Sequence, residues 1–323
     1  MPGPASVALV GCGYWGRNLA RNFAELGALA AVVDSHGPTL DQVTQATGAA
    51  GRTFAEVLAD PAITGVAIAT RAETHFSLAE AALRAGKHVY VEKPLTLDAG
   101  EAAHLIAVAE GQGRILMVGH LLRYHPLFQR FMELVRSNAC GQLRHVYSDR
   151  LSLGKVRTEE NVLWSFLVHD ISMILALAGG LPDKVTASGT AILHPSLADC
   201  ASVQMTFPSG LTAEARGSWL NPRKVQQIVA ICDEGAIVFE DSEPEWTRKL
   251  AIHPVTFDRV DGIPVPKRGE VIYPEVPRQE PLRLECQEFL DCLATGRQPL
   301  TGGREGLDVL TVLMRADSAM AAN

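Results

Sequence analysis

The sequence has no long hydrophobic run, no low-complexity tract and no block of charges of one sign. Its first apolar stretch, residues 7–10, is far too short to cross a membrane, and residues 1–4, which read MPGP, carry none of the basic charge that begins a signal peptide. With 47% hydrophobic and 20% charged residues, the composition is typical of a chain that folds along its whole length. We therefore expect a cytoplasmic protein with no membrane partner.

Paired cysteines and zinc-like spacings are absent as well. The six cysteines are scattered, without a CxxC pair or histidines at the spacing of a zinc site, so we expect free thiols and no metal site. A net charge of −7 argues against nucleic acid as a partner, because phosphate backbones are bound by basic surfaces. These absences favour a small molecule as the partner.

The length of 323 residues exceeds that of a usual domain, which predicts two domains. In the first third, short β-branched runs alternate with segments of helical periodicity, the pattern of a doubly wound parallel sheet. Strands are predicted over 7–10, 29–34, 65–70, 88–92 and 115–119, and helices over about 74–85 and from an N-cap at Asp98. The first domain is therefore predicted to be α/β and to cover residues 1–120.

After residue 120 the runs of alternating polarity become longer and are joined by turn sequences such as PSG at 208–210. The predicted elements are a helix over 127–136, strands over 143–153, 185–193, 201–207, 211–219 and 225–231, and two closing helices over 282–294 and 305–319. The second domain, 121–323, is thus predicted to be α+β with a mostly antiparallel sheet. Such a sheet often uses one face as an oligomer interface, so we expect a homodimer or homotetramer.

A glycine-rich turn follows the first predicted strand. Residues 11–16 read GCGYWG and open a helix: Gly11 permits a tight turn, Gly13 allows close approach of a pyrophosphate, and Gly16 lets helix and strand pack. Asp34 ends the second strand, where a carboxylate binds the adenosine ribose and repels a 2′-phosphate. The next two residues, SH, offer no arginine, so the pattern predicts a Rossmann domain that binds NAD rather than NADP. A purely structural turn is the alternative.

The strand at 88–92 runs directly into the tripeptide Glu92-Lys93-Pro94. The carboxyl ends of the strands are the edge at which doubly wound sheets bind ligands, so Lys93 is a candidate for contact with a substrate. From these three residues alone, a surface ion pair followed by a strand-ending proline is an equally good interpretation.

Three stretches together resemble the glucose-fructose oxidoreductase/inositol dehydrogenase (Gfo/Idh/MocA) family: GCGYWG at 11–16, TRAETH at 70–75 and EKP at 92–94. The resemblance covers essentially the whole chain. It implies that Lys93 lies beside the nicotinamide and the substrate hydroxyl, that the peptide before Pro94 is often cis, and that a later DxxxH motif supplies a catalytic histidine, here His169. The resemblance also implies cofactor contacts at Tyr14, Trp15, Thr70, Arg71, His75, Glu92, Lys93 and Pro94.

The histidine motif departs from the family pattern, because Ser165 stands where aspartate is usual. An apolar stripe from Ile171 to Ala178 predicts that His169 lies in the first turn of a helix and off its buried face. At that end the helix dipole disfavours imidazolium and keeps the ring able to accept a proton. The structural alternative is a histidine whose side chain only forms hydrogen bonds at the end of the helix. The neighbouring Asp170 is a candidate for orienting the imidazole or binding substrate.

The segment 155–172 resembles the WlbA-like UDP-N-acetylglucosaminuronate 3-dehydrogenases, which oxidise the C3 hydroxyl of a nucleotide-linked sugar acid. Guanidinium and ammonium groups suit a diphosphate or a carboxylate. The candidate substrate-binding residues are Arg123, Tyr124, Lys155, Arg157, Asn161, Trp164 and Asp170.

These observations predict an oxidoreductase that transfers a hydride from a sugar secondary alcohol to NAD, with the C3 hydroxyl of a UDP-linked N-acetylated sugar acid as the favoured substrate. In this hypothesis His169 removes the hydroxyl proton and Lys93 stabilises the alkoxide, or the two exchange roles. Two alternatives stay open: a dehydrogenase or ketoreductase of another sugar or an inositol, and a non-catalytic NAD-binding sensor.

Overall fold

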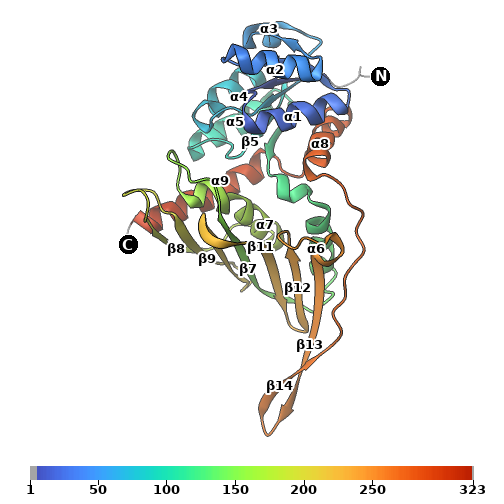
Figure 1. Ribbon diagram of the computed structural model, residues 1–323, viewed down its shortest axis with the longest axis vertical. Coiled ribbons are helices and arrows are strands. Elements are labelled where there is room, and N and C mark those ends of the chain that lie inside the picture. Colours follow the sequence, from blue (N-terminus) through green and yellow to red (C-terminus); the bar gives the residue numbers. More distant parts are fainter. Residues whose placement is uncertain (1–5, 322–323) are drawn as a thin grey trace. The chain divides into compact units, whose positions relative to one another are not determined.

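The computed structural model describes residues 6–321, and the chain divides into two compact units. The first unit comprises Met1–Tyr124 and Gln279–Leu310, and the second comprises His125–Arg278 and Thr311–Asn323 (Figure 1). The MPGP stretch at 1–4 lies outside the described residues. No helix within 6–321 is long and apolar enough to cross a membrane, and all six cysteines are free thiols.

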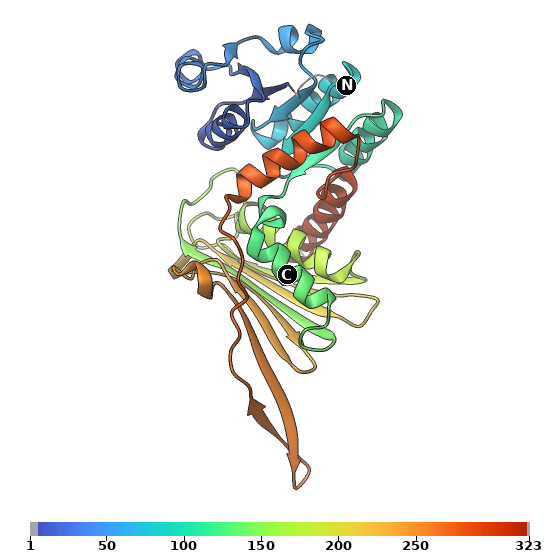
Figure 2. The same ribbon diagram turned by 90° about the vertical axis from the view of Figure 1, so that its right-hand side faces the viewer.

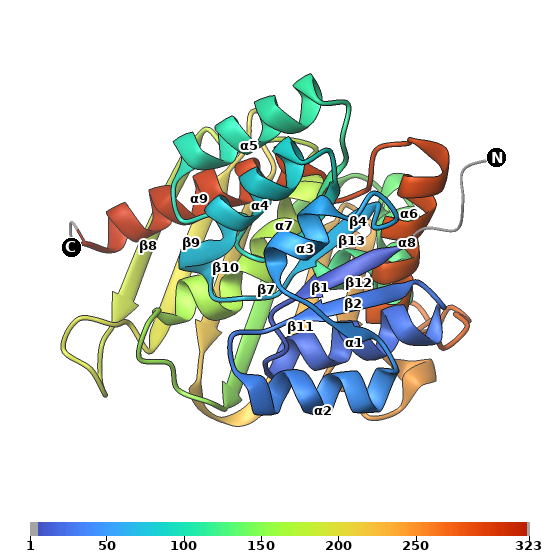
Figure 3. The same ribbon diagram turned by 90° about the horizontal axis from the view of Figure 1, so that it is seen from above.

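The first unit is built on a six-stranded parallel sheet with the strand order β3-β2-β1-β4-β5-β6, which confirms the predicted doubly wound fold. Helices α1 and α2 lie on one face of the sheet and α4 and α5 on the other (Figure 3). The strands are β1 Val7–Val10, β2 Leu29–Val33, β3 Ala50–Gly51, β4 Gly65–Ile68, β5 His88–Glu92 and β6 Leu116–Gly119. The helices that follow them are α1 Tyr14–Glu25, α2 Gly37–Thr47, α3 Phe54–Ala59, η1 Ala72–Thr74, α4 His75–Arg84, α5 Ala99–Gly111 and η2 Leu121–Tyr124.

Local sequence explains several of these boundaries. Asp98 caps α5 as expected, because its side chain accepts hydrogen bonds from the backbone N–H groups of Gly100 and Glu101. Thr53 and Glu56 form a capping box at the start of α3. Strands β1, β4 and β6 are buried along their whole length, as parallel strands covered on both faces must be.

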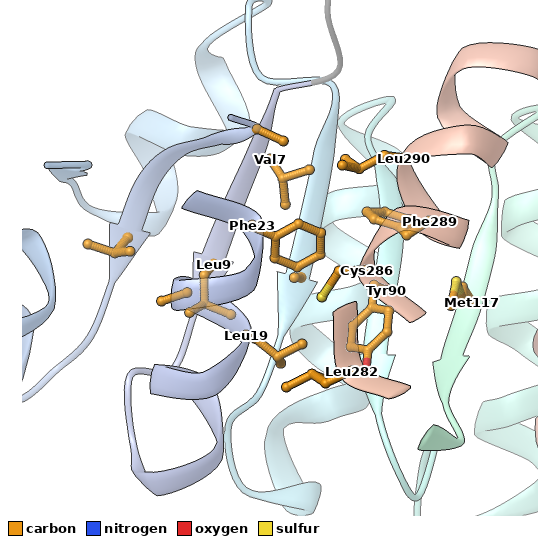
Figure 4. Packing of buried hydrophobic residues seen from close by; sticks show 14 of the residues in the cluster. Val7, Leu9, Leu19, Phe23, Tyr90, Met117, Leu282, Cys286, Phe289 and Leu290 are labelled. Carbon is orange, nitrogen blue, oxygen red and sulfur yellow. The ribbon is translucent and has the colours of Figure 1, made fainter. Parts of the chain in front are cut away.

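A helix from the far end of the sequence completes the core of the first unit. Helix α8 (Pro281–Thr295) packs Phe289 against Phe23 and Tyr90, with ring centroids 6.4 and 6.0 Å apart (Figure 4). All residues after 120 were predicted to belong to a second domain, whereas residues 279–310 belong to the first unit. The sequence predicted a helix over 282–294, but its periodicity carries no information about which sheet the helix will cover.

The second unit contains an eight-stranded sheet with the order β14-β13-β12-β11-β7-β10-β9-β8, and β7 with β10 is its parallel pair. The predicted mostly antiparallel sheet is therefore confirmed. The strands are β7 Leu143–Leu153, β8 Lys184–Thr190, β9 Cys200–Thr206, β10 Thr212–Ser218, β11 Leu220–Cys232, β12 Gly235–Glu240, β13 Leu250–Val260 and β14 Ile263–Arg268. The helical elements are α6 Pro126–Arg136, η3 Leu163–Leu167, α7 Val168–Ala178, η4 Trp246–Arg248 and the end of α9 (Gly303–Ala321).

Strands β12 to β14 were not predicted from the sequence. The tip of the β13–β14 hairpin runs beyond the other strands of its sheet (Figures 1 and 2). Every residue of β14 is exposed, so the alternation of buried and exposed side chains that identifies a half-buried strand is absent there.

Candidate active site

The glycine-rich turn between β1 and α1 has the geometry that a pyrophosphate requires. Gly11 has a φ of +92°, and a Cβ there would lie 2.7 Å from the Ala69 carbonyl oxygen. A Cβ on Gly16 would lie 1.9 Å from the Gly11 carbonyl oxygen, so helix and turn touch at this point. Gly13 is the N-cap of α1, and in the described part of the chain nothing lies within 4 Å of the place of its Cβ. The helix end therefore faces an open position, as an anion-binding helix does.

Asp34 is held at the end of β2 by two backbone donors. Its Oδ2 accepts a hydrogen bond from the Cys12 N–H at 2.6 Å and its Oδ1 accepts one from the His36 N–H at 2.8 Å. The carboxylate lines a cavity of about 410 Å³ to which Arg52 also contributes. Arg52 was not predicted, because the sequence pattern covers only the residues next to Asp34. The guanidinium is already bound by Asp60, with Nη1 2.5 Å from Oδ2.

His75 is a buried residue that ties two loops together. Its Nδ1 lies 2.8 Å from the Pro94 carbonyl oxygen and its Nε2 lies 3.2 Å from the Thr70 carbonyl oxygen. Burial lowers the pKa of His75, which favours the neutral ring. The cofactor contact expected for His75 does not fit a side chain that is only 1% exposed. The ring instead positions the backbone on which Lys93 and Thr70 stand.

The other residues of the two loops and of the α1 turn differ in exposure. Arg71 is exposed and forms an ion pair with Glu73 at 3.2 Å, and Tyr14 is 90% exposed. Trp15, by contrast, donates from its indole Nε1 to Glu92 Oε1 at 2.5 Å. The cofactor motif and the lysine motif are thus joined by a direct hydrogen bond.

Lys93 follows β5 at the carboxyl edge of the parallel sheet, and the Lys93–Pro94 peptide is cis. Glu92 also accepts a hydrogen bond from the Tyr90 hydroxyl at 2.9 Å. Burial raises the pKa of Glu92, while the hydrogen bonds from Tyr90 and Trp15 and the charge of Lys93 oppose that rise. Glu92 therefore belongs to a hydrogen-bonded network with Tyr90 and Trp15, directly before the lysine in the chain.

A second cluster lies just past β6. Arg123 is buried and donates from Nη1 to Glu305 Oε1 at 2.8 Å, and His120 Nε2 lies 3.5 Å from Glu305 Oε2. Burial lowers the pKa of His120. The hydroxyl of Tyr124 is buried and lies 2.9 Å from Thr301 Oγ1. Tyr124 therefore points into the unit, which does not fit the substrate contact expected of it.

His120 was not predicted as a site residue, although it follows the carboxyl end of a parallel strand, the same signal that indicated Lys93.

His169 lies in the first turn of α7 and is partly buried. The π-helical turn η3 directly precedes α7, so the helical segment begins at Leu163 rather than at His169. The predicted effect of a helix dipole on His169 is therefore wrong, because that effect is confined to the first turn of a helical segment.

Asp170 is completely buried and is not available to a substrate. Its Oδ2 accepts a hydrogen bond from Arg150 Nε at 2.6 Å, and its Oδ1 accepts one from Ser148 Oγ at 2.6 Å. Both partners belong to β7. Asp170 therefore anchors α7 to the sheet and supports His169 through the backbone.

The segment that precedes η3 contains two kinds of residues. Lys155 and Arg157 are exposed, and Arg157 Nε lies 3.9 Å from Glu160 Oε1. Asn161 Oδ1 accepts hydrogen bonds from the backbone N–H groups of Leu163 and Trp164, and its Nδ2 donates one to Asp317 of α9. The hydrogen bonds of Asn161 therefore stabilise the fold. The two cations remain candidates for binding a substrate anion, and Trp164 is partly buried.

Comparison with known proteins identifies the family. Residues 5–120 match the family described as an oxidoreductase family with an NAD-binding Rossmann fold, and residues 128–238 match the GFO/IDH/MocA C-terminal domain.

The chain belongs to the Gfo/Idh/MocA oxidoreductase family.

Two relatives illustrate the range of substrates in the family. The chain is 30% identical to the UDP-N-acetylglucosamine 3-dehydrogenase of Acidithiobacillus ferrooxidans, over 98% of this chain and 97% of the relative. It is 27% identical to the D-apiose dehydrogenase of Paraburkholderia graminis, over 95% of this chain and 85% of that protein. A solved structure of the Acidithiobacillus enzyme superimposes with a TM-score of 0.86 at 28% identity, covering 98% of this chain and 97% of that one. The chain is therefore an oxidoreductase of the class that acts on CH–OH groups, with an NAD-binding Rossmann domain.

Proposed function

We propose that this protein is an NAD-dependent dehydrogenase that oxidises the C3 hydroxyl of a UDP-linked N-acetylated glucosamine sugar. The supporting observation is the similarity, over nearly the full length of both chains, to a protein named as a UDP-N-acetylglucosamine 3-dehydrogenase. The segment 155–172 suggested a sugar acid of the same type, so the neutral sugar and its uronic acid are the two forms to compare.

The residues of the first unit fit the proposed cofactor. The open position at Gly13 and the uncapped end of α1 suit a pyrophosphate, and the fixed Asp34 carboxylate suits the two ribose hydroxyls of NAD. When bound, NAD supplies the acceptor for the hydride. The chain itself must bind the sugar, orient its hydroxyl and take up the hydroxyl proton.

We assign the proton chemistry to Lys93 and His169. A partly buried imidazole is suited to removing the proton of the substrate hydroxyl, and an ammonium group is suited to stabilising the alkoxide that develops. The exchange of these two roles, with Lys93 as the base, is distinguished by the pH profiles of the two single variants. His75 and Glu92 position Lys93, and Asp170 positions His169.

We assign recognition of the diphosphate to Lys155 and Arg157, the two exposed cations of the segment. An Arg157→Ala variant is expected to raise KM for a UDP-sugar about ten- to hundredfold with little change in kcat, because a lost charge-assisted hydrogen bond costs about 1.5–3 kcal/mol. A free sugar as the true substrate would leave KM unaffected.

The decisive experiment is the appearance of NADH absorbance when protein and NAD are mixed with UDP-N-acetylglucosamine, its uronic acid, free N-acetylglucosamine or an inositol. The wild type is compared with His169→Asn and with His194→Asn, which changes an exposed histidine. We expect turnover of a UDP-sugar that His169→Asn abolishes and His194→Asn retains. Turnover of only a free sugar or an inositol would refute the nucleotide-sugar assignment.

The non-catalytic sensor makes a different prediction. For a sensor, Lys93→Ala would bind NAD normally, and neither it nor the wild type would turn over any member of the panel. For the proposed dehydrogenase, Lys93→Ala should bind NAD and lose turnover that the wild type has.

A further inference from the structure

The Tyr90 hydroxyl lies between two carboxyl groups behind the lysine motif. It is 2.9 Å from Glu92 Oε1 and 3.1 Å from Glu285 Oε2. Tyr90 and Glu92 are two residues apart on β5 and so point to the same face of the sheet, where α8 supplies Glu285. Figure 4 shows the Tyr90 ring next to Cys286 and Leu282 of that helix. All three polar groups belong to the first unit.

The neighbouring strand leaves room for this arrangement. Gly119 on β6 pairs with Glu92, and a Cβ at Gly119 would lie 2.6 Å from the Tyr90 hydroxyl oxygen and 3.0 Å from Glu92 Oε1. Any side chain larger than hydrogen would push the hydroxyl away from one of its carboxyl partners. The close contact of three polar groups therefore depends on a glycine in the adjacent strand.

The number of protons available decides the charge of this cluster. A phenol has one proton to donate, and two ionised carboxylates can only accept. If both hydrogen bonds of Tyr90 exist, at least one carboxyl group must carry a proton. Trp15 donates to Glu92 and Lys93 adjoins it, so Glu92 is the ionised member.

Glu285 is the carboxyl group whose surroundings favour the protonated form. It is 0% exposed, and among the described residues its Oε1 is buried without a hydrogen-bond partner, a costly position for a negative charge. The titratable groups facing it are Glu92, Tyr90, Cys286 and Tyr124, none of them a cation. Burial and the charge of Glu92 raise the pKa of Glu285 well above its usual range.

We propose that Glu285 is a protonated acid that donates a hydrogen bond to the Tyr90 hydroxyl oxygen, so that Tyr90 donates to Glu92 and Glu92 is the ionised carboxylate of the cluster. Glu285 and Tyr90 are then positioning residues, which act on the reaction through Glu92. The protonation of Glu285 is independent of the proposed function, whereas its effect on turnover rests on that function.

Infrared spectroscopy tests the protonation directly. A protonated carboxylic acid has a carbonyl stretching band that a carboxylate lacks, and we expect this band at neutral pH in the wild type and its loss in Glu285→Gln. The control is Glu288→Gln on the same helix, because Glu288 is ion-paired with Arg297 and should have no such band to lose. Absence of the band in the wild type, or its persistence in Glu285→Gln, would overturn the proposal.

Kinetics test the positioning role. Glutamine mimics a protonated acid because its amide N–H can donate to Tyr90, whereas methionine cannot. We expect Glu285→Met to lower kcat about five- to tenfold with KM nearly constant and to shift the pH profile, and Glu285→Gln to restore most of both. Equal kcat values and pH profiles for Glu285→Gln and Glu285→Met would overturn the positioning role. NAD affinity checks that each variant is folded, and a protein without sugar turnover would refute the proposed function while leaving the infrared result decisive for Glu285.

Discussion

The role of a single residue in this protein depends on its hydrogen-bond partners. His75, Tyr124 and Asp170 each appeared in the sequence as candidates for contact with a ligand. Each is buried, and each has partners within its own unit: backbone carbonyls for His75, Thr301 for Tyr124 and Arg150 with Ser148 for Asp170. Such residues shape the site by holding other residues in place.

Asp170 allows a sharp test at this scale. Asp170→Ala leaves Arg150, whose side chain is 12% exposed, without its partner, and we expect the free energy of unfolding to fall by about 3–5 kcal/mol. Urea denaturation measures the change, and Asp183→Ala, at an exposed position, should stay within about 0.5 kcal/mol of the wild type. Normal stability with a raised KM would instead show that Asp170 contacts the substrate.

At the scale of elements, turns and caps determine where ligands and charges are placed. The turn into α1 contains glycines with two different functions. Gly11 and Gly16 are required by the protein's own packing, whereas the space at Gly13 is not needed by any described residue. A ligand is the physical reason to keep Gly13 small.

We therefore predict that Gly13→Ala separates folding from cofactor binding. The melting temperature should change little, because φ is −62° and the added methyl group meets nothing, while affinity for NAD should fall at least tenfold as the methyl group blocks the pyrophosphate. Fluorescence titration with NAD measures the affinity. Gly37→Ala in α2, also in open space, is the matched control and should retain both properties. Unchanged NAD affinity in Gly13→Ala would place the pyrophosphate elsewhere.

The N-cap of α6 predicts a dependence of stability on pH. His125 accepts a hydrogen bond from the Leu127 N–H through Nδ1, and burial lowers its pKa to about 4, with Asp241 and Lys249 as the charged groups facing it. The folded state favours the neutral His125 ring. The contribution of this ring to the free energy of unfolding is therefore fully present above the unfolded pKa of about 6.5 and is lost as pH falls toward 4. The loss is of the order of 3 kcal/mol.

Thermal unfolding at several pH values measures this effect. His125→Asn keeps an N-cap but does not titrate, so its melting temperature should fall less between pH 7 and pH 4.5 than that of the wild type. The exposed His194→Asn should follow the wild type. Parallel curves for His125→Asn and the wild type would contradict the assignment.

At the scale of the whole molecule, the homodimer or homotetramer expected from the open sheet stays a prediction. The hairpin of β13 and β14 adds a reason for it, since Phe257, Val260, Ile263 and Val265 are all 41% exposed or more. Pro264 and Pro266 lack the N–H groups that would extend the sheet, so a contact there would be made by side chains.

Light scattering after size-exclusion chromatography measures the mass of the assembly and so tests the oligomeric state. We expect a mass of two or four chains for the wild type and a smaller assembly for Val260→Asp/Ile263→Asp. The matched control is Leu193→Asp, another exposed apolar residue of the second unit. A monomeric wild type would exclude the homo-oligomer.

The sequence by itself determined the periodic and local features of this protein. Five of the six strands of the parallel sheet, all but β3, were predicted, as were the Asp98 cap, the GCGYWG turn and the family of both halves of the chain. Each depends on residues close together in the chain, so its signal is present without a structure. Lys93 and His169 were predicted in the same way, and their catalytic roles stay predictions.

Only the tertiary structure decided which sheet a helix covers and which charges are compensated. Helix α8 joins the first unit, Arg52 reaches the pocket of Asp34, and Tyr90 links Glu92 to Glu285, 193 residues further along the chain. Burial and hydrogen bonding are properties of surroundings assembled from distant segments. Residue spacing reports on the nearest turns of the chain, and it therefore contains no record of those partners.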